Sequence, residues 1–455
     1  MSPITTTLSP ETIEQACAPL ALAGAAVARR YVGATGARRP VHVVYGGAHL
    51  FRADLAQKLG AAAIRAFEEY APDAATLALA LGLPDAEPLL AQTVHARVLE
   101  KLRREPVEDL RIDFEDGYGA RPDAEEDEHA AAAARAVAEG MERGTLPPFL
   151  GIRIKSLGEE TRRRAVRTLD LFLTTLAAER GGKLPSGFVV TLPKITVAEQ
   201  VTALASLLDA LEAKLGIAPV AVGIELMIEA PQIILGPSGE CGLPRLLDAG
   251  RGRVASAHLG AYDYTAACDV TSTHQTLAHP ACDLARQMMQ LAFAGTGVRL
   301  ADGATNVLPI PTHKAAPGQR LGARAVSENR AMVLRAWKLH HDSIRRALIQ
   351  GFYQGWDLHP AQLPVRYAAT YAFFLEGLEP AAARLVNFVT RAAQATRVGQ
   401  VFDDAATGQG LLNFFLRALD TGAITEEEAT ERTGLSPAEL REKSFAKIVE
   451  GRRAP

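Results

Sequence analysis

Two carboxylates in the middle of the chain each follow an apolar stretch that is typical of a β-strand. Glu229 comes directly after residues 223–228, and Asp263 follows residues 254–260 about one β/α unit later. Side chains just past the ends of parallel strands meet at one rim of a barrel or open sheet. Such hard oxygen ligands favour Mg²⁺ or Mn²⁺, and Mg²⁺ commonly takes only one or two protein carboxylates. Glu229 and Asp263 are therefore the predicted ligands of a divalent metal.

Both carboxylates also have simpler interpretations. Asp263 could cap the helix that follows it. Glu225 lies four residues before Glu229 and shares its strand face, so it is a rival ligand; we favour Glu229 because it stands at the strand end. A metal held here would chelate a 2-oxo acid through its carboxylate and carbonyl oxygens and polarise the carbonyl.

Further polar residues follow the other predicted strands and are expected at the same rim. They are His49, Asp113, Glu115, Asp116, Arg153, Lys155, Lys194, Thr312, His313 and His359. We expect the substrate to be contacted by Arg153, Lys155, Gly260, Pro311 and His359. Arg153 is the one arginine set among carboxylates, and it could instead simply pair with the acidic residues at 113–116.

The elements that must position these residues alternate between strand and helix. Strands are predicted at 41–45, 109–114, 149–155, 187–192, 221–228, 254–260, 304–310 and 353–358, and helices separate nearly all of them. Eight such units predict an α/β TIM (β/α)8 barrel. We expect an N-terminal helical segment at 1–40, the barrel at 41–360 with a helical insertion at 71–105, and a C-terminal helical domain or lid at 361–455.

Composition restricts the class of partner. A formal net charge of -3 and 48% hydrophobic residues give no general attraction to nucleic acid or to an anionic membrane, so a small-molecule partner is favoured. Four scattered cysteines without a C-x-x-C pair indicate neither a disulfide framework nor zinc, and no stretch is apolar for long enough to span a membrane. We therefore expect a soluble, cytoplasmic protein. The glycine-rich stretches lack nucleotide-binding spacing.

Seven short motifs, in chain order, resemble those of the malate synthases, malyl-CoA lyases and citrate lyase β subunits. They are DFED at 113–116, RIK at 153–155, LPK at 192–194, IEAP at 228–231, GAYDY at 260–264, HPAQ at 359–362 and DDAAT at 403–407. The HPAQ segment is similar to the lyases and the DDAAT segment to the synthases. Ala261 stands where malate synthases have an arginine, and residues 230–231 replace their T-L-P.

The resemblance implies roles for individual residues. Glu229 and Asp263 would bind Mg²⁺ (or Mn²⁺), and Glu115 and Asp116 would hold water molecules of the metal. Arg153 would stabilise an oxyanion or enolate.

The aspartate of the DDAAT segment has a catalytic role in this resemblance. Asp404 would move the proton at the α-carbon of an acyl donor, unless it only caps the helix predicted at 405–419.

The implied activity is a Mg²⁺-dependent carbon–carbon lyase or synthase of the citrate lyase or malate synthase kind. It would join or cleave a small 2-oxo acid such as glyoxylate and an acyl-CoA-like donor. The alternatives are an aldolase of free 2-oxo acids that does not use CoA, and a lyase subunit that depends on partner chains. We also expect a homo-oligomer, because helical tails on barrels often form interfaces.

Overall fold

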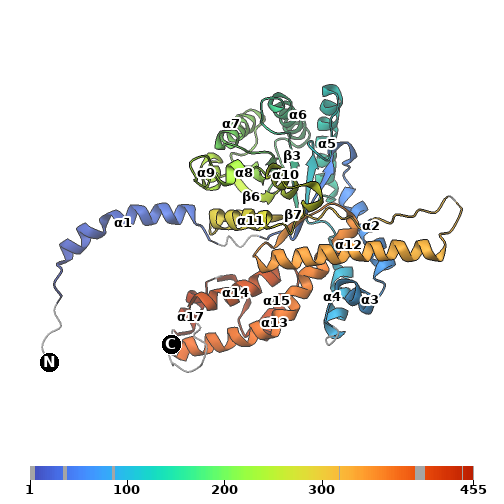
Figure 1. The fold of residues 1–455 in the computed structure, drawn as a ribbon. Coiled ribbons are helices and arrows are strands. Elements are labelled where there is room, and N and C mark those ends of the chain that lie inside the picture. The colour runs from blue at the N-terminus through green and yellow to red at the C-terminus, as the bar shows by residue number, and fades with distance from the viewer. Residues whose placement is uncertain are drawn as a thin grey trace.

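The computed structural model describes residues 6–33, 38–84, 88–316, 318–394, 405–442 and 444–453. Its centre is a closed parallel barrel in which each strand pairs with the next in the chain (Figure 1). The strands are β1 (His42–Gly47), β2 (Asp109–Asp113), β3 (Phe149–Arg153), β4 (Val189–Leu192), β5 (Gly223–Ile228), β6 (Val254–Leu259), β7 (Arg299–Ala304) and β8 (Gln354–Asp357). Pairing of His42 with Gly355 closes the barrel between β1 and β8. The predicted TIM barrel is confirmed.

Helices surround the barrel because they carry apolar stripes at helical spacing. In α6 (Arg162–Arg180) the buried Leu169, Phe172, Leu173 and Leu176 fall at i, i+3, i+4 and i+7. The other helices between the strands are α2 (Leu55–Tyr70), α3 (Ala74–Leu81), α4 (Pro88–Arg104), α5 (Asp123–Arg143), α7 (Ala198–Leu215), α8 (Pro231–Ile234), α9 (Leu243–Ala249), α10 (Ala261–Ala267), α11 (Pro280–Phe293) and α12 (Ala323–Ile349).

Helices also flank the barrel in sequence. The first, α1 (Pro10–Arg30), begins at the cap residue Ser9, has no buried side chain and extends away from the barrel in Figure 1. After β8 come α13 (Leu363–Gln394), α14 (Ala405–Asp420), α15 (Glu426–Thr433), α16 (Pro437–Glu442) and α17 (Phe445–Arg453). The division of the chain into three domains stays a prediction. No helix within the described ranges is long and apolar enough to cross a membrane.

The seventh strand was wrongly predicted. It occupies Arg299–Ala304, whereas residues 305–310, the apolar part of the predicted range, form no strand. The hydrophobic pattern of the sequence favoured a strand at 304–310 because the true strand, β7, contains Asp302 and Gly303, residue types that are uncommon in strands. In the folded protein Asp302 is buried and accepts a hydrogen bond from Arg286 Nε at 2.8 Å. This ion pair allows an aspartate within the strand. Pro311 therefore stands well past the strand end, not beside it.

Charged residues fill much of the barrel interior. Strand β2 alternates, so that Leu110 and Ile112 join the apolar core while Arg111 points across the barrel to Glu225 on β5. The guanidinium donates Nε to Glu225 Oε1 at 2.9 Å and Nη2 to Oε2 at 2.6 Å. Burial would raise the pKa of Glu225, but the positive charge of Arg111 and the contact with His258 hold it well below its usual range.

Breaking this interior pair should destabilise the fold strongly. Arg111→Met leaves the buried Glu225 carboxylate without its main cation, and we expect the free energy of unfolding in urea to fall by about 3–5 kcal/mol. The double variant Arg111→Met/Glu225→Gln should recover part of the loss, because it removes one of the two carboxylates left unpaired; the other is Asp109, to which Arg111 also donates. As a control, Arg104→Met on the exposed Arg104–Glu100 pair should change stability by less than about 1 kcal/mol. Equal losses in the two single variants would contradict the prediction.

Candidate functional site

The carboxyl ends of β2 to β6 bring charged residues from distant parts of the chain together. Asp113 ends β2, Arg153 ends β3, Lys194 lies two residues past β4, and Glu229 directly follows β5. Asp263 lies in the first turn of α10, just past β6. The structure thus groups Arg153, Glu115, Asp116, Glu229 and Asp263 around one further residue, Lys194.

Arg153 is fixed by a two-point contact with a carboxylate. Its Nε and Nη2 donate to the two oxygens of Asp113 at 2.7 and 2.5 Å. Its Nη1 lies 2.9 Å from Glu115 Oε2 and 3.5 Å from Asp116 Oδ2. Burial would lower the pKa of Arg153, but the hydrogen bond and charge of Asp113 raise it. The pairing with the acidic residues at 113–116, considered from sequence, is present, and it directs Nη1 toward Glu115.

The Arg153 guanidinium also rests against aromatic rings. Its central carbon lies 5.0 Å from the ring centre of Tyr45 and 5.6 Å from that of Trp356. These contacts fill the space on the barrel side of the guanidinium. Together with Asp113, they leave it almost no freedom to rotate.

Lys194 connects four carboxylates at the rim. Its ammonium binds Glu115 and lies 3.6 Å from Asp116 Oδ1 and 3.8 Å from Asp263 Oδ2. Its backbone N–H donates to Glu229 Oε1 at 2.6 Å. The backbone adopts the left-handed conformation, with φ of 53°, which non-glycine residues rarely take. That strained conformation turns the N–H and the side chain toward different carboxylates of one site.

Sequence reasoning placed Lys194 at the rim but assigned it no role. The signal that could have identified it is its position after Pro193 at a strand end. An ordinary strand-to-helix connection shows the same signal, so position alone did not distinguish the two cases.

Glu229 is buried against a glycine. A side chain at Gly260 would place its Cβ 2.3 Å from Glu229 Oε2, so only glycine leaves room for this carboxylate. Burial and the negative charge of Asp263 together raise the pKa of Glu229 to about 8, against the opposing effect of Lys194. Glu225, by contrast, lies inside the barrel and is neutralised by Arg111. The choice of Glu229 over Glu225 as the residue at the rim agrees with this geometry.

The chemistry of these donors fits a divalent cation. Glu229 and Asp263 offer two oxygen ligands, the number that Mg²⁺ commonly takes from a protein. Their mutual repulsion is only partly offset by Lys194, and a cation between them would relieve it. Within the described ranges, no three His, Cys, Asp or Glu side chains are grouped to hold a metal, so water and substrate would have to complete the coordination.

The remaining predicted residues are placed less favourably. Lys155 donates to Glu126 Oε2 at 2.6 Å and to Phe114 O at 2.8 Å, which ties its ammonium to α5. His359 lies just past β8, where its Nδ1 accepts from Ala361 N at 3.2 Å. Pro311 belongs to the connection after β7 and has no recorded contact with the group around Lys194. Asp404 lies outside the described residues.

Comparisons with known proteins agree with the fold. A citrate lyase from Burkholderia xenovorans LB400 is 19% identical, with a TM-score of 0.52, over 75% of this chain and 92% of its own. A malate synthase from Haloferax volcanii, in a magnesium/glyoxylate complex, is 13% identical with a TM-score of 0.45, over 91% and 98% of the two chains. The expected resemblance is confirmed, and at such low identity it concerns the fold. A search of curated proteins finds no match.

A family model agrees over most of the chain. It matches residues 20–448, a range that contains all eight strands, the group around Lys194 and most of the C-terminal helices. The chain therefore belongs to the family described as domain of unknown function DUF6986.

Proposed function

We propose that this protein is a Mg²⁺-dependent carbon–carbon lyase or synthase that works through an enolate. Its substrates would be a small 2-oxo acid of the glyoxylate type and an acyl-CoA-like donor. The main observation behind the proposal is that Glu229 and Asp263 lie together at the carboxyl ends of the strands, close to Lys194 and to Nη1 of Arg153. The citrate lyase-like fold and the ordered motifs at 113–116, 153–155 and 359–362 support it.

Glu229 and Asp263 would hold the cation, which supplies Lewis acidity toward the oxo acid when bound. Lys194 keeps the two carboxylates in place, through its N–H to Glu229 and its ammonium near Asp263. Glu115 and Asp116 would accept hydrogen bonds from nearby water. These are the same two carboxylates that contact both Lys194 and Arg153, so the cationic and anionic parts of the site fix one another.

Arg153 would stabilise the negative charge that develops on an enolate or alkoxide oxygen. Asp113 already holds its Nε and Nη2, so the guanidinium needs little reorganisation during the reaction. A preorganised donor of this kind typically contributes about 3 kcal/mol to transition-state stabilisation.

The proton at the α-carbon of the donor would be moved by Asp404, a role that rests on the resemblance of the DDAAT segment. The alternative is that Asp404 only caps the helix predicted at 405–419. If Asp404→Asn lowers kcat while the helix content, measured by circular dichroism, is unchanged, Asp404 acts as the base and not merely as a helix cap.

Removal of Asp263 should abolish metal-dependent turnover. We expect Asp263→Asn to lower Mn²⁺ affinity, measured by electron paramagnetic resonance, by about 100-fold or more. Asp263 is half exposed, so the fold should be retained. Asp170→Asn, an exposed carboxylate on α6, is the matched control and should bind Mn²⁺ like the parent. Unchanged Mn²⁺ affinity in Asp263→Asn would remove this residue from the site.

The reaction itself can be tested with the same two variants and the parent chain, purified alone with Mg²⁺. Cleavage of malyl-CoA, citramalyl-CoA and free 4-hydroxy-2-oxo acids should be compared side by side. We expect turnover of a CoA thioester. Turnover of the free acids alone would favour an aldolase, and no turnover by a chain that binds Mn²⁺ would favour dependence on a partner.

Gly260→Ala should weaken metal binding without adding or removing a ligand. The new Cβ would meet Glu229 Oε2 at 2.3 Å and Glu229 Cβ at 2.6 Å, so the carboxylate must move. We expect Mn²⁺ affinity to fall about 10–100-fold, the range for changes that misorient a ligand. Gly410→Ala, where nothing lies within 4 Å, is the control and should bind normally. Normal binding by Gly260→Ala would mean that Glu229 is not a ligand.

A further inference from the structure

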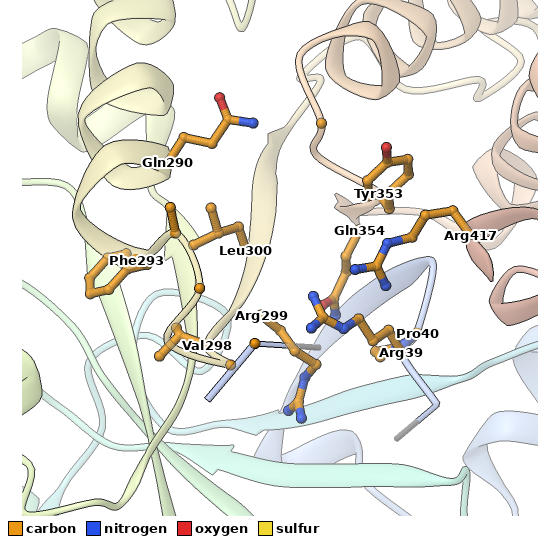
Figure 2. Close-up of a pocket in the computed structure, with 15 residues that line it drawn as sticks. Arg39, Pro40, Gln290, Phe293, Val298, Arg299, Leu300, Tyr353, Gln354 and Arg417 are labelled. Atoms are coloured by element: carbon orange, nitrogen blue, oxygen red, sulfur yellow. The ribbon is translucent and has the colours of Figure 1, made fainter. Parts of the chain in front are cut away.

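A cavity lies at the opposite end of the barrel from Lys194. It has a volume of about 340 Å³ and opens at the amino ends of three strands (Figure 2). Arg299 and Gln354 are the first residues of β7 and β8, and Arg39 shortly precedes β1. Arg417 reaches the cavity from α14. Barrel and C-terminal helices therefore share one cavity.

Three arginines line this cavity, and Figure 2 shows the guanidinium groups of Arg39 and Arg417 near one another beside Gln354. Arg417 is partnered: its Nη1 lies 3.0 Å from Asp420 Oδ2, and its guanidinium lies 5.3 Å from the ring centre of Tyr353. Gln354 is also occupied, because its amide donates to Asp109 Oδ2 at 3.1 Å.

The other two arginines have no acidic partner in the described ranges. Arg299 Nε is buried without any hydrogen-bond acceptor, and its guanidinium rests over the ring of Phe149, 5.4 Å from the ring centre. Arg39 makes no recorded hydrogen bond or ion pair there either. Two half-buried guanidinium groups that lack a counterion are unusual, since buried charges are normally paired.

Burial disfavours the charged form of both arginines. Burial and the positive charges of Arg417 and Arg299 together lower the pKa of Arg39 to about 10, while Asp420 opposes this shift. Burial also lowers the pKa of Arg299, which the more distant carboxylates Asp109 and Glu225 oppose. Asp420 supplies one negative charge against three positive ones, so the cavity carries an excess of positive charge.

We propose that this cavity binds a small multivalent oxyanion, of the phosphate ester or dicarboxylate class, between Arg39, Arg299 and Arg417. Guanidinium groups present paired N–H donors that match the oxygens of a phosphate or carboxylate. The volume is at the lower end of the range for small-molecule sites, which suits a small metabolite. Phe293 and Tyr353 supply apolar walls for its carbon skeleton.

This site is separate from the one proposed at the carboxyl ends of the strands and does not depend on that function. A bound anion would contact Arg299 on the barrel and Arg417 on α14 at once. It would therefore hold the C-terminal helices against the barrel, and its binding should raise the stability of the whole chain.

The test is binding of inorganic phosphate, pyrophosphate and succinate to the full chain, by calorimetry and by thermal unfolding at ionic strength matched with KCl. The parent chain should bind at least one of these anions and unfold at higher temperature in its presence. Preference for pyrophosphate would identify the phosphate class, and preference for succinate the dicarboxylate class. Failure of all three to bind above the KCl control would overturn the proposal.

Variants then locate the site. Arg39→Gln should weaken anion binding at least tenfold, and without anion it should unfold at a higher temperature than the parent, because an unpaired buried charge is gone. Arg299→Gln provides a second, independent variant with the same expected loss of binding. Arg163→Gln, an exposed arginine on α6, is the charge-matched control and should bind like the parent. Equal binding by Arg39→Gln, Arg299→Gln and Arg163→Gln would place the anion elsewhere and refute the proposal.

Discussion

The structure depends on the neutralisation of charge inside a closed barrel from which water is excluded. Most barrels of this class fill the interior with branched apolar side chains, whereas here Arg111 and Glu225 span it from β2 to β5. An ion in such a place is tolerated only when its hydrogen bonds and its opposite charge are both supplied. Tyr45, Thr191, Ser256 and His258 supply further contacts of Glu225, and Asp109 accepts from the remaining N–H groups of Arg111.

The same rule explains the two ends of the barrel. At the carboxyl end, Asp113 neutralises Arg153, and Lys194 is shared among four carboxylates, so too little positive charge is left to neutralise Glu229 and Asp263 together. At the amino end, positive charge remains on the arginines. Neutralisation is therefore complete in the middle of the barrel and incomplete at both ends, with opposite sign. Each end of the barrel would therefore stabilise a ligand of opposite charge: a cation at the carboxyl end and an anion at the amino end.

Much of the fold could be predicted from the sequence because strand and helix periods alternate clearly. The error at β7 arose where one buried ion pair, Asp302 with Arg286, outweighs strand propensity, and such pairing depends on a contact between separate elements. For the candidate site, strand ends and motifs predicted that Glu229, Asp263, Glu115 and Arg153 lie at one rim, where the structure groups them. The contacts that Lys194 makes with four carboxylates were not predicted. They depend on a left-handed backbone conformation that cannot be inferred from the residue type. The arginines of the amino-end cavity left no motif, because they come from three distant segments.

Closure of the barrel also constrains how the chain is made. Strand β1 pairs with β8 through His42 and Gly355, so the first strand lacks one neighbour until nearly the whole barrel has been synthesised. At about 5–20 residues per second, the intervening stretch of about 310 residues takes roughly 15–60 seconds to emerge from a ribosome. During that interval β1 presents an open edge that can pair with other chains. Protection of the nascent amino-terminal half, by chaperones or by slow local folding, is thus a requirement that the topology itself imposes.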